Sequence, residues 1–339
     1  MFVVQVRMAA LPQRLTARRI LSFCLFCIAS LLFFPSAFSQ DFPNKPLRIV
    51  LAYETGGSVD FLARTVANKL SERLGQPVLV EAKPGANERI ASQHLLMSPA
   101  DGYTMLLVAV PHATNPALFA NIPYDTRRDF QPLIHLTNLP PVLLVRATSD
   151  IKTLDDLVKK AKAEPGTISY GSPGVATGNH LMVELFQYVS GTSLIHVPHK
   201  GVAALTTAVV GGHVDVGSIT MSPSILGYIT SGRLRALAIG PSERAAVLAD
   251  VPTFAEQGYK DAVVVTWFGL VMRAGTPAGI VNKLNHEINA VLAMPDVRER
   301  LASAGMSVVG GSSEQFTRHI HSEIDRWGKI IKERGIKVD

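Results

Sequence analysis

Short apolar runs alternate along the chain with longer segments in which apolar residues recur every three or four positions. Residues 47–51 form such a run and predict a strand, whereas residues 59–74 place apolar side chains at the i, i+3, i+4, i+7 spacing of a helix face. Gly75 and Pro77 supply the signals that end this helix. The alternation continues and predicts strands at 78–80, 104–110, 141–146, 168–170, 194–197, 214–216, 234–239 and 263–271.

Further helices are predicted at 153–164, from the end of the segment 171–178 through 189, at 202–210, and near 277–293, 296–304 and 313–334. Thr153 and Asp156 have the spacing of a capping box at the start of a helix that runs to Glu164. Strands separated by helices of about 10–15 residues indicate βαβ units and mostly parallel sheets. The chain is longer than a single doubly wound sheet with its helices usually requires, so we expect an α/β protein with two sheets and a cleft between them. No Pro/Gly/Ser-rich linker separates the halves, which favours a hinge made of crossing strands.

The first 39 residues differ from the rest of the chain. Arg14, Arg18 and Arg19 precede a mainly apolar run at 20–34, and small residues follow Pro35. This pattern predicts a secretory signal that is cleaved near Ser39. A transmembrane anchor is the alternative, but the run is short against the roughly 20 residues of a spanning helix. We therefore expect an exported protein in the periplasm, with Met8 as an alternative start.

Cleavage changes the composition of the chain. Four arginines and no acidic residue precede Gln40, so the formal net charge falls from +6 to +2 on cleavage, and nucleic-acid binding loses its main support. Cys24 and Cys27 both lie in the predicted signal, which leaves the mature chain with neither a disulfide nor a thiolate ligand. No cofactor is expected, and nothing argues against a monomer.

Two glycine-rich segments join a predicted strand to a predicted helix, at 51–58 and at 171–178. Glycine lets the backbone approach a ligand closely, and the N-terminus of the following helix favours an anion. A plain tight turn is the alternative for either segment alone. Both lie at the carboxyl ends of strands, where open α/β sheets bind ligands.

Enzyme motifs are missing from the chain. There is no Walker lysine, no GxSxG elbow and no HExxH, and Tyr170 stands where the elbow around Ser172 requires glycine. The chain is therefore not expected to be an enzyme, to carry catalytic residues or to bind a metal. A hydrolase that acts through Ser172 is the remaining alternative. Tyr53 is expected either to lie against a ligand or to cover a helix, and Trp267 to pack in the core or at the hinge.

Several ordered segments of the mature chain carry a family resemblance. They include residues 42–46 with 48–50, 56–60, 83–86, 101–104, 196–198 with 200–201, 235–238, 250–253, 267–270 and 274–277. Together they resemble the Bug family, the extracytoplasmic receptors of tripartite tricarboxylate transporters. The resemblance covers essentially the whole mature chain.

The resemblance implies a type II, Venus-flytrap periplasmic binding protein. Its first domain would comprise residues 40–142 and 268–339, and its second residues 143–267. The ligand would be a small organic or aromatic carboxylate, bound by backbone N–H groups and hydroxyls. Carried over to this sequence, the ligand contacts would be Tyr53, Thr55, Gly56, Gly57, Ser58, Val110, His112, Ser172, Gly174, Val175, Thr177 and Thr220.

Three segments depart from the family pattern. Thr55 replaces the proline of the Pro-Gly-Gly that the family commonly has after its first strand, and Glu54 adds a charge there. Asn87 and Glu88 replace a glycine pair, and residues 217–220 lack an acidic residue. The last departure argues against an amino-acid ligand. The partner would be a membrane permease; a sensor that docks on a membrane histidine kinase has the same fold and stays an alternative.

Overall fold

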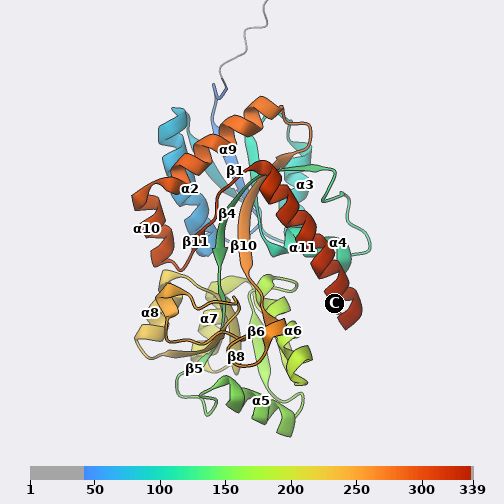
Figure 1. Cartoon of the computed structure of the whole chain (residues 1–339), viewed down its shortest axis with the longest axis vertical. Helices are drawn as coiled ribbons and strands as arrows, with labels where there is room; N and C mark the ends of the chain where they lie inside the picture. The colour runs from blue at the N-terminus through green and yellow to red at the C-terminus, as the bar shows by residue number, and fades with distance from the viewer. Residues whose placement is uncertain (1–41, 337–339) are drawn as a thin grey trace, which may run out of the picture. The chain divides into compact units, whose positions relative to one another are not determined.

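The computed structural model describes residues 42–336, so the predicted signal at 1–39 lies outside the described residues. The described chain from Pro43 onward belongs to one compact unit that contains two β-sheets (Figure 1). None of its helices is both long and apolar enough to cross a membrane.

The first sheet has six strands in the order β11-β4-β10-β3-β1-β2. Strand β1, next to the edge strand β2, pairs in parallel with β2 and β3, and the remaining pairs are antiparallel. The strands are β1 (Leu47–Leu51), β2 (Val78–Ala82), β3 (Thr104–Val108), β4 (Phe130–Leu139), β10 (Thr266–Arg273) and β11 (Ser307–Val308).

The second sheet has five strands in the order β7-β6-β8-β5-β9. Strand β6 pairs in parallel with β7 and β8, whereas β5 pairs antiparallel with β8 and β9. The strands are β5 (Pro141–Arg146), β6 (Ser169–Ser172), β7 (Ile195–Pro198), β8 (Val216–Thr220) and β9 (Leu234–Ile239).

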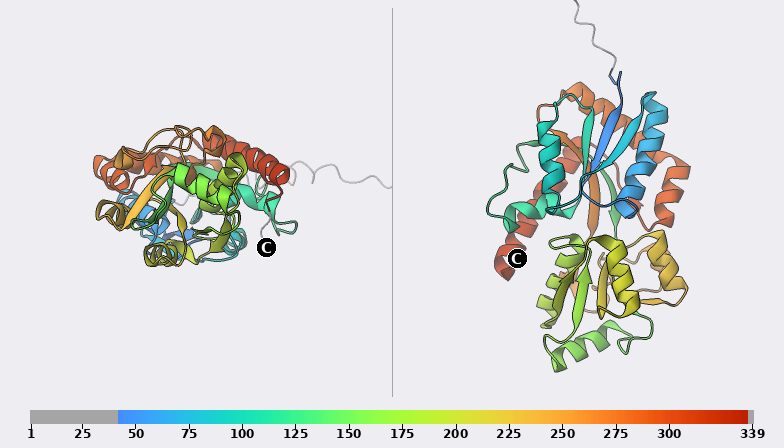
Figure 2. Two further views of the ribbon diagram at one scale, coloured as in Figure 1. Left: turned by 90° about the horizontal axis from the view of Figure 1, so that it is seen from below. Right: turned by 180° about the vertical axis from the view of Figure 1, so that it is seen from behind.

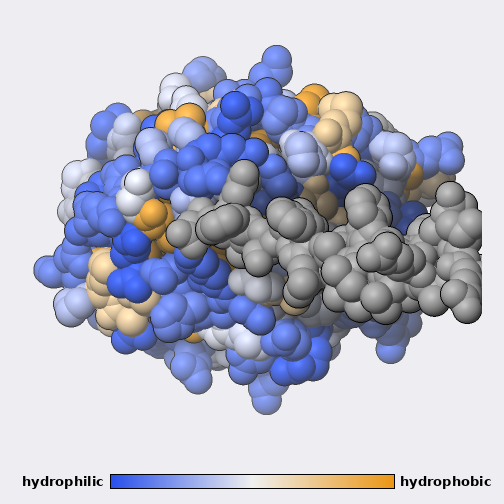
Figure 3. All heavy atoms as spheres, turned by 90° about the horizontal axis from the view of Figure 1, so that it is seen from above, coloured by the Kyte–Doolittle hydropathy of each residue, from blue (hydrophilic) through white to orange (hydrophobic). Residues whose placement is uncertain are grey.

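Helices cover both sheets (Figure 2). Those that pack around the first sheet are α2 (Ser58–Leu74), α3 (Arg89–Met97), α4 (Val110–Leu118), α9 (Ala278–Ala293), α10 (Pro295–Ser303) and α11 (Ser313–Arg334). The second sheet is accompanied by α5 (Leu154–Ala163), α6 (Gly178–Ser190), α7 (Gly201–Gly211) and α8 (Pro223–Thr230). On the face drawn in Figure 3, apolar side chains are scattered among hydrophilic ones and form no broad patch.

The two-sheet α/β architecture is confirmed, but the expectation of mostly parallel sheets is wrong. Both sheets are mixed, because β4 and β10 run antiparallel beside the parallel strands of the first sheet, and β5 does so in the second. Strand β4 is not predicted from the sequence, because Pro132 and polar residues such as Asn138 interrupt its apolar positions. Helices α3, α4 and α8 are not predicted either.

The chain passes between the two sheets at two points. Only Pro140 separates β4 from β5, and the loop after Gly240 leads from β9 to β10. The Gly240 N–H donates to the Pro141 carbonyl at 2.9 Å, and the Val264 N–H donates to the Gly240 carbonyl at 3.0 Å. The first bond joins the two crossings, and the second lies within the crossing that leads from β9 to β10. A hinge at these crossings stays a prediction.

Local signals in the sequence are confirmed at two helix ends. Helix α2 ends at Gly75, which has the left-handed φ of 64° that glycine adopts easily. The capping box at α5 is formed: the Asp156 N–H donates to Thr153 Oγ1 at 3.1 Å, and Asp156 Oδ2 accepts from the Thr153 N–H at 2.9 Å. Trp267 is buried in the core, where its indole N–H donates to Glu323 at 3.3 Å.

Candidate functional site

A pocket of about 470 Å³ is lined by residues from elements of both sheets. The first sheet contributes the β1–α2 loop and the start of α2 (53–59), the start of α4 (109–111), and Thr266 and Phe268 of β10. The elements around the second sheet contribute the rest of the lining. Those residues are Pro173, Thr177, Gly178, 200–203, Thr206, Thr207, Thr220, Ser222, Ser224 and Tyr228.

Five helix N-termini meet at this pocket, those of α2, α4, α6, α7 and α8. The N-caps of α2, α4 and α7 are Gly57, Ala109 and Lys200, and none of them accepts a hydrogen bond from its own helix through its side chain. The first N–H groups of these helices are therefore not satisfied by a side-chain cap. Each helix N-terminus also carries roughly half a positive charge, so the pocket favours an anion.

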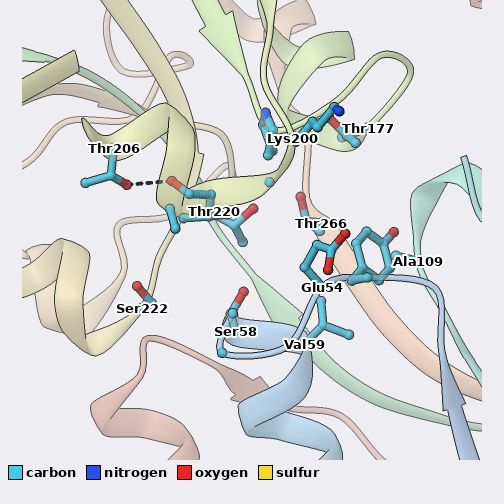
Figure 4. A pocket seen from close by; sticks show the side chains of 18 of the residues that line it. Glu54, Ser58, Val59, Ala109, Thr177, Lys200, Thr206, Thr220, Ser222 and Thr266 are labelled. Carbon is cyan, nitrogen blue, oxygen red and sulfur yellow. Dashed lines mark hydrogen bonds between the residues drawn. The ribbon is translucent and has the colours of Figure 1, made fainter. Parts of the chain in front are cut away.

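Two side chains with a formal charge line the pocket, Lys200 and Glu54 (Figure 4). Both are exposed, and neither forms an ion pair within the described part of the chain. The ammonium group of Lys200 adds to the field of the helix N-termini, whereas the carboxylate of Glu54 opposes it. The arrangement therefore has one exposed positive charge that favours an anionic ligand and one negative charge that disfavours a highly charged anion.

Hydroxyl groups supply most of the remaining polar lining. Several are already used within the protein: Thr177 Oγ1 donates to the Gly174 carbonyl at 2.9 Å, Thr206 Oγ1 to the Val202 carbonyl at 2.7 Å, and Thr220 Oγ1 to Asn179 Oδ1 at 2.8 Å. Thr266 differs, because its buried Oγ1 has no hydrogen-bond partner among the described residues. Thr266 lines the pocket, so an unpartnered hydroxyl lies at the pocket wall.

The first glycine-rich segment lies on the pocket as its sequence indicates. Tyr53, Thr55, Gly56, Gly57 and Ser58 are all lining residues. Gly56 has a φ of 86°, which favours glycine, whereas a Cβ on Gly57 would meet no atom within 4 Å. The turn therefore requires glycine at 56, and Gly57 leaves the space open in front of the helix.

The second glycine-rich segment contributes less of the lining than expected. Thr177 lies on the pocket, and so do Val110 and Thr220 from other elements, but Ser172, Gly174 and Val175 do not. The Ser172 side chain is fully buried beneath the loop, where its Oγ donates to the Gly174 carbonyl at 2.9 Å and lies 2.7 Å from His196 Nε2. It holds the shape of the loop in this structure.

His112 also lies away from the pocket lining. The predicted strand was extended to residue 110, but α4 begins there, so His112 falls in the first helical turn and packs edge-on against Phe130 at 4.7 Å. Burial lowers the pKa of His112 to about 3, so the ring is neutral at neutral pH.

The structure adds lining residues that the sequence analysis did not select as ligand contacts. Phe268 and Thr266 come from β10, which enters the pocket between the two sheets. Lys200 belongs to one of the segments that carry the family resemblance but was not selected as a ligand contact; its place directly before α7 was the available signal. Ser222, the N-cap of α8, accepts from the Ile225 N–H at 3.3 Å.

Within the described residues, no group of three or more His, Cys, Asp or Glu could hold a metal ion.

Comparison with known proteins gives a family for the chain. Residues 62–336 match the family described as "Tripartite tricarboxylate transporter family receptor". Protein BugT of Bordetella pertussis is 34% identical over 302 residues, which is 88% of this chain and 92% of BugT.

Solved structures are similar over nearly the same length. Rpa4515 of R. palustris with adipate is 32% identical, covers 88% of this chain and 99% of its own, and has a TM-score of 0.83. MatC from Rhodopseudomonas palustris with bound malate is 28% identical, covers 86% of this chain and all of its own, and has a TM-score of 0.80. The resemblance found in the sequence is confirmed, and the chain belongs to the Bug-type members of the tripartite tricarboxylate transporter receptor family.

Proposed function

We propose that this chain is a periplasmic receptor that captures a small organic carboxylate in a cleft between two domains and passes it to a membrane permease of the tripartite tricarboxylate type. The observation that supports the proposal best is the meeting of five helix N-termini and Lys200 at one pocket. The family is one of transport receptors, and its fold is that of substrate-binding proteins.

The proposed ligand contacts follow from the lining. Backbone N–H groups at the starts of α2, α4 and α7 would bind the carboxylate, with Lys200 as the counter-charge. Hydrogen bonds to a charged acceptor are shorter and about twice as strong as neutral ones, so they would supply the specific part of the affinity. The hydroxyls of Ser58, Thr177, Thr220 and Thr266 complete the polar contacts, while Ser172, Gly174 and Val175 shape the loop that carries Thr177.

Two carboxylate-bound relatives narrow the proposed ligand class. Rpa4515 holds adipate and MatC holds malate, both small dicarboxylates. In this chain Glu54 adds a negative charge to the pocket and Lys200 is the one lining cation among the described residues. We therefore propose a mono- or dicarboxylate with an uncharged body that packs against Phe268, Val59 and Val110.

Domain closure would turn binding into a signal for the permease. The proposed domains are residues 40–142 with 268–339, and residues 143–267, which meet close to the two chain crossings. A hinge at these crossings would close the pocket around the ligand and exclude water, as in other two-domain receptors.

A thermal-shift screen of the protein purified from periplasmic expression tests the proposal. Adipate and malate are compared with adipamide, the neutral diamide of adipate. A ligand at about 100 times its Kd adds about 2.7 kcal/mol to stability, which corresponds to a rise of several degrees for a chain of this size. We expect a rise with at least one carboxylate of the panel and none with the diamide. An equal rise with adipamide, or no rise with any carboxylate, would contradict the proposed ligand class.

A further inference from the structure

A left-handed turn behind the pocket is unusual for its residue types. Ala86, Asn87 and Glu88 have φ values of 47°, 53° and 69°, and they follow Gly85 with a φ of 120°. The left-handed region is unfavourable for a non-glycine residue because its Cβ comes too close to the following carbonyl oxygen, and such conformations persist only where the surroundings hold them. Three such residues in a row therefore point to specific contacts.

Contacts to two pocket-forming elements hold this turn. Asn87 Nδ2 donates to Asn115 Oδ1 at 2.7 Å, and Asn115 Nδ2 donates to the Asn87 carbonyl at 2.7 Å, which fastens the turn to α4. Glu88 is 2% exposed, and its Oε1 accepts hydrogen bonds from the Tyr53 hydroxyl at 2.6 Å and from the Ala109 N–H at 3.0 Å. Tyr53 and Ala109 both line the pocket.

We propose that Glu88 is a positioning residue of the pocket, that it fixes Tyr53 and the N-terminus of α4, and that it does so as a neutral carboxylic acid. The proposal rests on the proposed function, because it concerns the wall of an anion-binding pocket. An ionised carboxylate directly behind that wall would repel the ligand that the five helix N-termini attract. A neutral acid accepts the same two hydrogen bonds and leaves the field of the pocket positive.

The surroundings of Glu88 favour the neutral form. Its carboxyl is buried, forms no ion pair in the described part of the chain, and its Oε2 has no hydrogen-bond partner there, so ionisation would leave an unpaired buried charge. Burial raises its pKa to about 8, although the bonds from Tyr53 and Ala109 oppose the rise.

The titratable and charged groups around Glu88 supply no counter-charge. Arg89, the next residue along the chain, directs its side chain elsewhere. Its Nε donates to the Ala86 carbonyl at 2.9 Å, and its guanidinium lies 4.0 Å from the centre of the Phe119 ring. The pKa values of Tyr53 and Tyr124 are raised, mainly by burial, so both phenols are neutral. His112 on α4 is neutral as well, since burial lowers its pKa to about 3.

Thermal and chemical unfolding of the ligand-free full chain between pH 5 and 9 tests the neutral state directly. Glu88→Gln is uncharged at every pH and nearly the same shape. Because the pKa of Glu88 is raised in the folded protein, its contribution to the free energy of unfolding of the native chain is lost as pH rises from about 4.5 to about 8. Glu88→Gln has no group that titrates at this position, so its stability does not fall for this reason. The ratio of the folding constants, variant over native, should rise by up to about tenfold per pH unit within that window.

The matched control is Glu164→Gln, an exposed carboxyl at the end of α5. The ratio of its folding constant to that of the native protein should not change between pH 5 and 9. Parallel pH curves for native protein and Glu88→Gln would overturn the proposal, since Glu88 would then be ionised in the fold. The difference between curves removes the titration of the histidines, which both proteins share.

Adipate affinity as a function of pH gives a second, independent readout. For native protein it should fall by about fivefold from pH 7 to 9.5, the effect of a unit charge roughly 8 Å away at an effective dielectric constant of about 40. For Glu88→Gln it should be independent of pH. A pH-dependent fall of equal size in both proteins would overturn the proposal. If the stability ratio rises as expected and adipate binds neither protein, the neutral acid is supported and the proposed ligand class is at fault.

Discussion

Lys200→Met is the most informative single change in the pocket. Lys200 is the one lining side chain with a positive charge among the described residues, and methionine keeps most of its length. A hydrogen bond to a charged group contributes about 1.5–3 kcal/mol, or roughly 10–150-fold in Kd. Because Lys200 is exposed in the ligand-free structure, solvent screening places the expected loss at the lower end, about tenfold.

This loss of affinity is measured by calorimetric titration, at low and high salt, with a carboxylate that the native protein binds. The native affinity should weaken with added salt more than that of Lys200→Met, since salt screens the missing attraction. Thermal stability should stay within about 0.5 kcal/mol, because the Lys200 side chain makes no capping bond to α7. Lys162→Met, an exposed lysine on α5 outside the pocket, is the matched control.

Glu54→Gln provides the opposite charge change in the same pocket. It should tighten the binding of a dicarboxylate by a few-fold, since it removes a repulsion.

A Lys200→Met variant that binds within twofold of native protein at low salt would refute the reasoning. The helix N-termini would then hold the anion without a side-chain charge.

Three further predictions concern the pocket wall, the chain crossing and the buried histidine. Thr266→Val should weaken ligand binding by about 1.5 kcal/mol, or roughly tenfold, without lowering stability, because the lost hydroxyl has no partner in the ligand-free protein; equal affinity for both proteins would remove Thr266 from the site. Gly240→Ala should lower the unfolding free energy by about 1–3 kcal/mol in denaturant titrations, since its Cβ would lie 2.3 Å from the Val264 carbonyl oxygen; unchanged stability would mean that the crossing relaxes freely. His112→Leu should reduce the loss of stability between pH 6.5 and 4.5, because burial lowers the pKa of His112 to about 3 and the folded protein binds fewer protons at this site than the unfolded chain as pH falls; an acid sensitivity equal to that of native protein would contradict this.

Local signals in the sequence predicted the parts of the site that local chemistry decides. The turn before α2 and the start of α6 at Thr177 are both glycine-rich junctions, and both lie on the pocket. His112 could not be placed, because the apolar run at 104–110 gives no sign that a helix begins at Val110. The face of the chain on which His112 lies changes with that one boundary.

Tertiary pairing decides the parts that the sequence did not reveal. Thr266 and Phe268 reach the pocket only because β10 pairs antiparallel with β3 and β4, and neither residue type marks a binding site by itself. The left-handed turn at 86–88 was equally hidden, since it depends on Asn115 and Ala109, which lie more than 20 residues further along the chain. Spacing along a sequence carries no record of such contacts.

A crystal structure of the protein with the carboxylate that binds most tightly tests the central claim most directly. The account predicts a ligand carboxylate within hydrogen-bond distance of the first backbone N–H groups of α2 and of at least one helix from the second sheet, with Lys200 turned toward it. A carboxylate that points to solvent, or a ligand that binds outside this pocket, would contradict the account.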